Sequence, residues 1–286
     1  MRVEDLDGPR VRPGLEDRIL AELRWLGLDW DEGPDLPGAG GPHAPYRQSE
    51  RSALYAAALE RLREARAVYP CFCSRAEIAR ASQAPHGPAD DGPRYPGTCR
   101  ELGAAEVRER SMSRRPAWRL RVPPGPVEFR DEVHGSIAFD VQATAGDFVV
   151  MRADGVGAYQ LAVTVDDAAM AITDVVRGDD LLPSTARQLL LYRALGLAAP
   201  RFGHVPLLVG DDGARLAKRH GARSLGELRD AGADPRAVVG FLASTCGLAS
   251  VGARVSPAGL VPGFRLEAIP REPAILRASD VEALLR

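Results

Sequence analysis

The sequence has few cysteines, no long apolar run and no strong excess of charge of one sign. Four cysteines in 286 residues are too few for the disulfide framework of a small secreted domain. No apolar run approaches the roughly 18 residues that span a bilayer, and the charged start MRVEDLDGPR lacks the apolar stretch of a signal peptide. The net charge of -2 indicates no general affinity for nucleic acid, so any such surface must be local. These features predict a cytoplasmic protein.

The composition is that of an ordinary globular protein, with 45% hydrophobic and 27% charged residues. The length predicts about two domains, or one large domain with an insertion. After residue 121, strand-like and helix-like segments alternate, which is typical of a parallel α/β sheet. The segments that predict strands are 127–130, 137–141, 148–152, 158–165 and 172–176.

Several residues predict where helices begin. Ser49 is a candidate cap for the helix that follows it, and Ser184 or Thr185 for a helix over 184–195. The C-terminal region is expected to be mainly helical, because it contains three capping sequences: Ser224-x-x-Glu227, Asp234-Pro235 and Ser279-x-x-Glu282.

Three of the four cysteines fall within one turn-rich stretch. Cys71, Cys73 and Cys99 with one further ligand would satisfy the tetrahedral geometry that zinc prefers. His86 and Tyr95 are both candidates for the fourth ligand, the first by ordinary zinc chemistry and the second as a rarer phenolate. A metal-free cluster of buried cysteines is the alternative interpretation.

Tyr159 and Arg177 are candidates for binding a small carboxylate. Tyr159 lies in the predicted strand 158–165, and Arg177 directly follows the predicted strand 172–176. Residues at the carboxyl ends of parallel strands converge on the ligand crevice of such a sheet. An arginine offers a planar fork of donors that matches a carboxylate. A solvated acidic loop beside a structural arginine is the competing interpretation, because Asp166-Asp167 and Asp179-Asp180 lie close by.

Two basic stretches could contact phosphates. The string RLAKRH (215–220) follows a predicted turn, and its Lys218 is a compact cation suited to a polyphosphate. Six arginines and Trp118 lie between Arg108 and Arg121, a composition that could grip a nucleic-acid backbone. A solvated surface is the alternative for both stretches.

In their order along the chain, these pieces resemble the catalytic part of class I aminoacyl-tRNA synthetases of the glutamate-specific kind. Within that family, the resemblance is closest to the short glutamyl-queuosine tRNA(Asp) synthetases, because no long anticodon-binding region follows RLAKR. The strings concerned are RVEDLD (2–7), YRQSERSALY (46–55), CFC with YPGTC (71–73 and 95–99), YQLAVTVDD (159–167), VVRGDDLLPSTARQ (175–188), HVPLL (204–208) and RLAKR (215–219).

The resemblance implies an α/β fold. We expect a Rossmann-like parallel-sheet catalytic domain without its first strand, an inserted zinc-containing subdomain and a mainly helical C-terminal part. The expected limits are 1–69 for the first part of the catalytic domain, 70–121 for the zinc insertion, 122–222 for the rest of the catalytic domain and 223–286 for the C-terminal region.

The resemblance also implies a reaction. L-Glutamate and ATP, with Mg²⁺, form glutamyl-adenylate, and the glutamyl group passes to queuosine in the anticodon of tRNA(Asp). A monomer with no membrane partner is expected.

The family's functional residues carry over to several positions. Glu4 matches the position whose carboxylate contacts the substrate ammonium, and Tyr159 and Arg177 match the other glutamate contacts. A donor-only guanidinium at Arg177 would reject the amide of glutamine. Lys218 matches the second lysine of the KMSKS-like loop, which binds ATP and stabilises charge on its phosphates. The family's structural zinc ligands match Cys71, Cys73, Tyr95 and Cys99.

One family motif is absent from these 286 residues. The string R-F-A-P-S-P-T-G-x-L-H-x-G-N, whose histidine contacts ATP phosphates, has no counterpart here. We therefore expect the true start to lie upstream and the chain as written to be impaired in activation. Two alternatives to the queuosine enzyme stay open: a catalytically silent, zinc-stabilised tRNA-binding protein, and a fragment of an ordinary glutamyl-tRNA synthetase.

Overall fold

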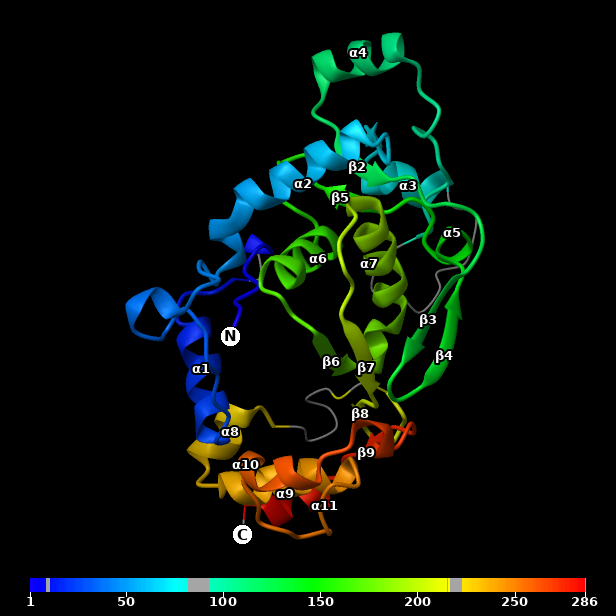
Figure 1. Ribbon diagram of the computed structural model, residues 1–286. Coiled ribbons are helices and arrows are strands. Elements are labelled where there is room, and N and C mark those ends of the chain that lie inside the picture. Colours follow the sequence, from blue (N-terminus) through cyan, green and yellow to red (C-terminus); the bar gives the residue numbers. More distant parts are fainter. Residues whose placement is uncertain (9–10, 82–92, 215, 217–222, 286) are drawn as a thin grey trace.

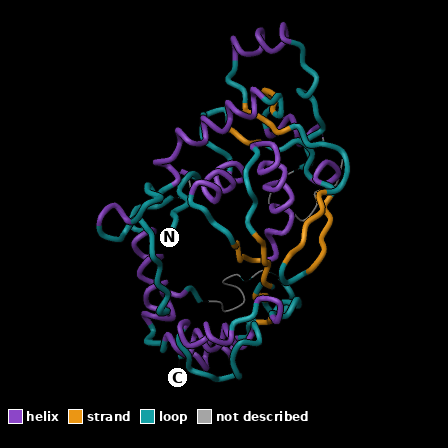
Figure 2. Tube along the Cα trace, in the orientation of Figure 1, coloured by secondary structure: helices purple, strands orange, loops and turns teal. Residues whose placement is uncertain are grey.

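The strands of the computed structural model, which describes residues 1–8, 11–81, 93–214, 216 and 223–285, form separate sheets (Figures 1 and 2). In the largest sheet, of order β4-β3-β7-β6, β7 lies parallel to β3 and β6, whereas β4 is antiparallel to β3. The prediction of a parallel sheet is thus only partly right. The turn between β3 and β4 is too short for the crossover that a parallel pair needs, so β4 pairs antiparallel to β3. The bounds are β3 (Val127–Asp131), β4 (Gly135–Phe139), β6 (Asp174–Gly178) and β7 (Arg201–Val205).

Two smaller sheets complete the described strands. The first has the order β1-β2-β5 and is antiparallel throughout, and the second is a parallel pair of β8 and β9. The chain therefore has an α/β fold with mixed sheets. The bounds are β1 (Val68–Cys71), β2 (Ala117–Leu120), β5 (Val149–Met151), β8 (Leu208–Val209) and β9 (Ala274–Ile275).

The main core lies where α2 (Ser52–Glu64), α6 (Tyr159–Ala169) and α7 (Leu182–Leu195) pack on one another (Figure 1). α7 also packs on β3, and α6 on β5. Their apolar side chains are almost completely removed from water, which is the largest favourable term in folding. The least exposed aliphatic side chains here are Leu62, Val150, Leu161 and Leu191.

Residues 158–165, for which the sequence predicts a strand, belong to α6, so that prediction is wrong. All residues from 160 to 167 are buried, because α2, α7 and β5 surround the helix. A helix buried on every side has no solvent-exposed polar face, so the helical period is hidden. Its apolar residues can then resemble the alternation of a strand. The other four predicted strands are confirmed to within two residues as β3, β4, β5 and β6.

Of the five helix starts with a predicted cap, two are confirmed and three are wrong. Ser224 and Asp234 cap α8 (Leu225–Asp230) and α9 (Pro235–Thr245). Ser49 instead binds Asp5 from within the 3₁₀ helix η3 (Gln48–Arg51). Ser184 and Thr185 lie inside α7, where Pro183 supports an earlier start, and Ser279 lies inside α11 (Ala278–Leu284).

The C-terminal helices gather at one end of the molecule, and α4 projects from the opposite end (Figure 1). α1 packs against α8, and Leu26 joins the apolar cluster of the C-terminal helices. Among the described helices, none combines the length and the apolar character that a membrane span requires. The remaining bounds are α1 (Leu15–Trp25), α3 (Arg75–Ala81), α4 (Ala104–Ser113), α5 (Val141–Thr144) and α10 (Pro257–Leu260).

Candidate active site

Arg177 lies near the carboxyl end of β6, where the protein interior holds one side of its guanidinium. Its Nε donates to Nε2 of His204 at 3.1 Å, and its Nη2 donates to Oγ1 of Thr185 at 2.8 Å and Oε1 of Gln188 at 2.9 Å. Its Nη1 has no hydrogen-bond partner within the part of the chain that the structure describes. Arg177 thus keeps the two N–H donors of Nη1 for a ligand.

His204 and Asp131 form a pair behind Arg177, and neither side chain is exposed. Nδ1 of His204 lies 2.6 Å from Oδ2 of Asp131. Burial lowers the pKa of His204. Burial raises the pKa of Asp131, but the hydrogen bonds from His204 and from backbone N–H groups outweigh it, so the pKa falls below its ordinary value. At neutral pH the pair is therefore a carboxylate and a neutral imidazole.

Glu4 is held in place by Arg2. Nη2 of Arg2 donates to Oε1 of Glu4 at 2.9 Å, and Nη1 donates to Oδ1 of Asp167 at 2.6 Å. Val3, between them, fixes the backbone: its N–H donates to the carbonyl of Tyr46 at 2.8 Å. The Glu4 side chain is 41% exposed, so its carboxylate remains accessible to a ligand.

Tyr159 begins α6 and completes the group of predicted glutamate contacts. Partial burial raises the pKa of Tyr159, the charge of Glu4 raises it further, and the charge of Arg177 lowers it. Charges act on one another in this way only over short distances, because solvent screens distant pairs. Hydrogen bonds of their neighbours join the three positions: Arg2 binds both Glu4 and Asp167 of α6, and Gln160 of α6 binds Ser184, next to the Thr185 that holds Arg177.

The interpretation of Asp166-Asp167 as a solvated acidic loop is wrong, because both residues are buried within α6. The carboxylate of Asp166 accepts hydrogen bonds from Gln48 at 2.9 Å, Arg51 at 2.6 Å and Tyr55 at 2.8 Å. A buried carboxylate needs such partners to offset its lost hydration. The network connects α6 to η3 and α2 below the crevice.

Cys71, Cys73 and Cys99 form a candidate metal centre beside β1. Their Sγ atoms all lie within 4.8 Å of one another. The Tyr95 hydroxyl lies 3.4 Å from Sγ of Cys71 and 3.9 Å from Sγ of Cys73. Three thiols and a phenol thus surround one point, a donor set that fits a tetrahedral zinc ion. His86, the other candidate ligand, lies outside the described residues.

Proton equilibria in the cluster also suit a cation. Burial first, and then the neighbouring Cys71 charge, raise the pKa of Cys73 to about 12. Burial also raises the pKa of Cys71, but the Tyr95 hydrogen bond and the Arg119 charge outweigh it and lower that pKa. The Cys71 thiolate is therefore favoured relative to an ordinary thiol, and its charge opposes ionisation of Cys73. A bound dication would remove this repulsion and hold all the thiols deprotonated.

The arginine stretch between Arg108 and Arg121 divides between surface and interior. Arg108 and Arg110 are exposed on α4. The guanidinium of Arg119 instead lies 3.8 Å from the ring centroid of Tyr95, and that of Arg121 4.8 Å from the ring centroid of Tyr69. At least these two inward arginines serve the structure around the cysteine cluster. Lys218, the predicted phosphate ligand, lies outside the described residues.

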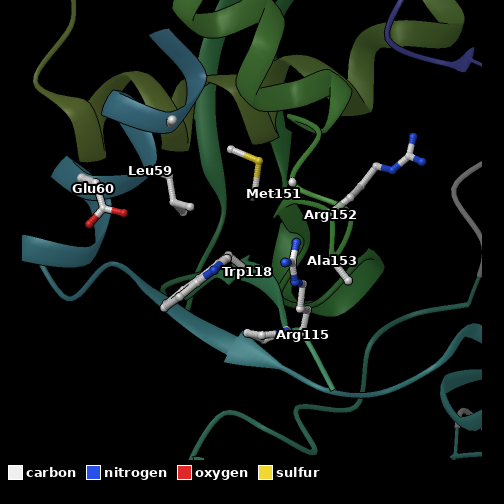
Figure 3. A pocket seen from close by; sticks show the side chains of 10 residues that line it. Leu59, Glu60, Arg115, Trp118, Met151, Arg152 and Ala153 are labelled. Carbon is white, nitrogen blue, oxygen red and sulfur yellow. The ribbon is translucent and has the colours of Figure 1, made fainter. Parts of the chain in front are cut away.

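A pocket separate from the crevice lies between α2, β2 and the loop after β5 (Figure 3). Arg115 points into it beside the ring of Trp118 (Figure 3). None of the predicted glutamate contacts lines this pocket. Its lining residues are Ala56, Leu59, Glu60, Arg115, Pro116, Trp118, Met151, Arg152, Ala153 and Gly155.

The sequence predictions missed the partners that hold Arg177. Thr185 was interpreted as a cap, whereas it and Gln188 are buried polar residues three positions apart on α7. That spacing is a usable signal, because buried polar groups on one helix face need hydrogen-bond partners. Asp131 gave no local signal, since its contact with His204 depends on sheet register.

Comparison with known proteins gives consistent similarities. The family model for the tRNA synthetases class I (E and Q), catalytic domain, matches residues 1–253. A glutamyl-Q tRNA(Asp) synthetase from Symbiobacterium thermophilum is 53% identical over 99% of this chain and 87% of its own length. A glutamate–tRNA ligase from Halorhodospira halophila is 48% identical over 92% and 55%, respectively. A solved glutamate tRNA ligase from Elizabethkingia meningosepticum, in complex with its amino acid, has a TM-score of 0.82 at 27% identity, covering 98% of this chain and 61% of that one.

Proposed function

The chain belongs to the family of class I tRNA synthetases for glutamate and glutamine, as part of their catalytic domain, and on this premise we propose that it glutamylates queuosine in the anticodon of tRNA(Asp). The family consists of ligases that join an amino acid to tRNA with ATP. One observation carries the finer proposal. The chain is 53% identical to the Symbiobacterium glutamyl-Q tRNA(Asp) synthetase over 285 residues, and 48% identical to the Halorhodospira glutamate–tRNA ligase over 266 residues.

The crevice supports glutamate as the amino acid. The N–H donors that remain on Nη1 of Arg177 face the side-chain carboxylate in this proposal, and Glu4 offers a carboxylate to the ammonium group. We assign Tyr159, at the start of α6, to the contact with the aliphatic part of the substrate. Glutamine would turn an amide N–H group toward donors, which leaves both unpaired and disfavours its binding.

The proposed reaction has two steps. An oxygen of the glutamate α-carboxylate attacks the α-phosphorus of ATP, and pyrophosphate leaves to give glutamyl-adenylate. A hydroxyl of the queuosine cyclopentenediol then attacks the activated carbonyl, loses its proton, and AMP leaves. We assign Lys218 to the phosphates, where a compact cation stabilises developing negative charge together with Mg²⁺.

The cysteine cluster is proposed to hold one structural zinc through Cys71, Cys73, Tyr95 and Cys99. Zinc bound there cross-links the end of β1 to the turn at 95–99, and four protein ligands leave no open position for substrate. A separate apolar cluster that includes Phe72, Ile78 and Tyr95 supports treating residues 70–121 as the zinc subdomain. We propose that the protein acts as a monomer, because one chain supplies Glu4, Tyr159 and Arg177.

The test uses protein expressed from its complete coding sequence. Glutamate-dependent exchange between ATP and pyrophosphate, without tRNA, is the expected first result. Labelled glutamate is then offered to queuosine-containing tRNA(Asp), to tRNA(Asp) from cells that lack queuosine, and to tRNA(Glu). We expect loading of the first RNA alone.

The other outcomes correspond to the alternatives. Loading of tRNA(Glu) would identify an ordinary glutamyl-tRNA synthetase activity and contradict the queuosine proposal. Binding of tRNA without exchange or loading, by correctly folded and zinc-loaded protein, would identify a catalytically silent tRNA-binding protein.

A further inference from the structure

Arg177 is anchored by a chain of buried hydrogen bonds that begins at Asp131. We propose that Asp131, His204 and Thr185 are positioning residues that fix the plane of the Arg177 guanidinium and thereby set its selectivity for a carboxylate. This inference rests on the proposed function, because it takes glutamate as the ligand of Nη1. None of the three residues needs to touch the substrate.

The direction of each hydrogen bond follows from the Asp131 carboxylate, which can only accept. Nδ1 of His204, 2.6 Å from Oδ2 of Asp131, must therefore carry the imidazole proton. The neutral ring then presents a lone pair at Nε2. That lone pair faces two donors, the Nε–H of Arg177 and the hydroxyl of Thr185, each 3.1 Å away, and the opposite tautomer could accept from neither.

The anchor is assembled from four elements, so the fold itself determines it. Sheet register places Arg177 of β6 opposite His204 of β7, and β3 brings Asp131 to the other side of the imidazole. Thr185 and Gln188 reach the guanidinium from α7. Asp131, His204 and Thr185 have no exposed surface, so water cannot replace a lost partner here.

The anchor leaves the guanidinium with one orientation. Three of its five N–H donors are bound inside the protein, and the two on Nη1 remain for a ligand. A guanidinium free to rotate would keep its charge, but its Nη1 donors would no longer point in one fixed direction. Discrimination between a carboxylate and an amide depends on that direction, so it would weaken more than the general attraction for anions.

Asp131→Asn is a sharp probe, because its neighbours determine how the new amide must lie. Oδ1 of Asp131 accepts backbone N–H groups of Val133 at 3.0 Å, His134 at 2.9 Å and His204 at 3.3 Å. The amide oxygen takes this position, so its NH₂ group faces Nδ1 of His204. The imidazole proton then moves to Nε2, where it opposes the Nε–H of Arg177.

The tautomer can be read without any activity assay. In ¹⁵N spectra we expect His204 to carry its proton on Nδ1 in the wild type and on Nε2 in Asp131→Asn. The protein has five histidines, so the signal is assigned with the variants His43→Gln, His86→Gln, His134→Gln and His220→Gln. A wild-type His204 protonated on Nε2, or on both nitrogens at neutral pH, would overturn the inference.

Steady-state pyrophosphate exchange supplies the functional test. Loss of one hydrogen bond to a charged group predicts that Asp131→Asn raises KM for glutamate about 10- to 100-fold, with KM for ATP unchanged. Thr185→Val, which keeps the shape and removes the hydroxyl, is also expected to raise KM for glutamate. Thr185→Ser restores the acceptor and should recover most of the affinity.

Asp147→Asn is the matched control, because Asp147 is also a buried carboxylate but binds Tyr69 and Arg100 near the cysteine cluster. It is expected to lower the melting temperature without changing KM for glutamate. A rise in glutamate KM equal to that of Asp131→Asn would overturn the inference, as would unchanged kinetics in Asp131→Asn and Thr185→Val. Absence of exchange by the wild type would instead contradict the proposed function, while the tautomer test still decides the anchor.

Discussion

The guanidinium of Arg177 uses its donors in two directions, and this division explains why arginine is required there. Nε and Nη2 hold the side chain to the interior, while Nη1 binds no other group in the part of the chain that the structure describes. A lysine has one charged group on a flexible stem and cannot do both. Recognition and anchoring are thus properties of a single planar group.

Arg177→Lys therefore tests the residue itself. The substitution keeps the positive charge but removes the aligned donors, so we expect KM for glutamate to rise about 10- to 100-fold. Arg201→Lys is the control, because Arg201 is an exposed arginine of the neighbouring strand that pairs with Asp174. Equal KM values for both variants, measured by pyrophosphate exchange, would remove Arg177 from the glutamate site.

The cysteines give a second test at this scale. Cys73→Ser replaces a soft thiolate by a hydroxyl that is a poor zinc ligand, so the variant should lose most of its zinc and several degrees of thermal stability. Cys246→Ser is the control, because Cys246 lies outside the cluster. Elemental analysis and thermal melting give the readouts. A metal content that is equally low in wild type and both variants would contradict the zinc proposal.

At the scale of elements, features set by neighbouring residues could be predicted from the sequence, whereas features set by tertiary packing could not. The Ser224 capping box and strands β3 to β6 follow from neighbouring residues, so the sequence predicted them. α6 was mistaken for a strand because its complete burial depends on α2 and α7. Tyr159 and Arg177 were predicted to bind a carboxylate from their placement with predicted strands, and the family resemblance added Glu4, whereas the anchor at Asp131 and His204 required knowledge of sheet register.

The two C-terminal capping sequences of the Ser-x-x-Glu type offer a direct test of this distinction. Ser224 accepts the N–H of Glu227 and caps α8, so Ser224→Ala should lower the free energy of unfolding by about 0.5–2 kcal/mol. Ser279 has the same sequence signature but lies exposed inside α11. Ser279→Ala should therefore change stability by less than about 0.5 kcal/mol in urea unfolding. A reversed order would contradict these helix starts.

At the scale of the whole molecule, one buried carboxylate joins segments that are distant in sequence. Asp166 of α6 binds Gln48 and Arg51 of η3. The backbone N–H of Gln48 donates to the carbonyl of Val3 at 3.0 Å, next to Glu4. The position of the N-terminal segment at the crevice therefore depends on this interior ion pair.

Removing Arg51 would leave the Asp166 charge buried with two neutral partners. The Arg51 side chain is 3% exposed and that of Asp166 is not exposed. We expect Arg51→Met to lower the free energy of unfolding by about 3–5 kcal/mol, since an unpaired buried charge is strongly destabilising. The double variant Arg51→Met/Asp166→Asn should recover part of this loss, because it removes the unpaired charge as well.

Arg63→Met is the surface control for this cycle. Arg63 pairs with Glu60 in an exposed i,i+3 contact, and such pairs contribute about 0–1 kcal/mol. Urea unfolding of the single and double variants measures each difference. A double variant less stable than Arg51→Met would contradict the argument, because the loss would then come from packing rather than from an isolated charge.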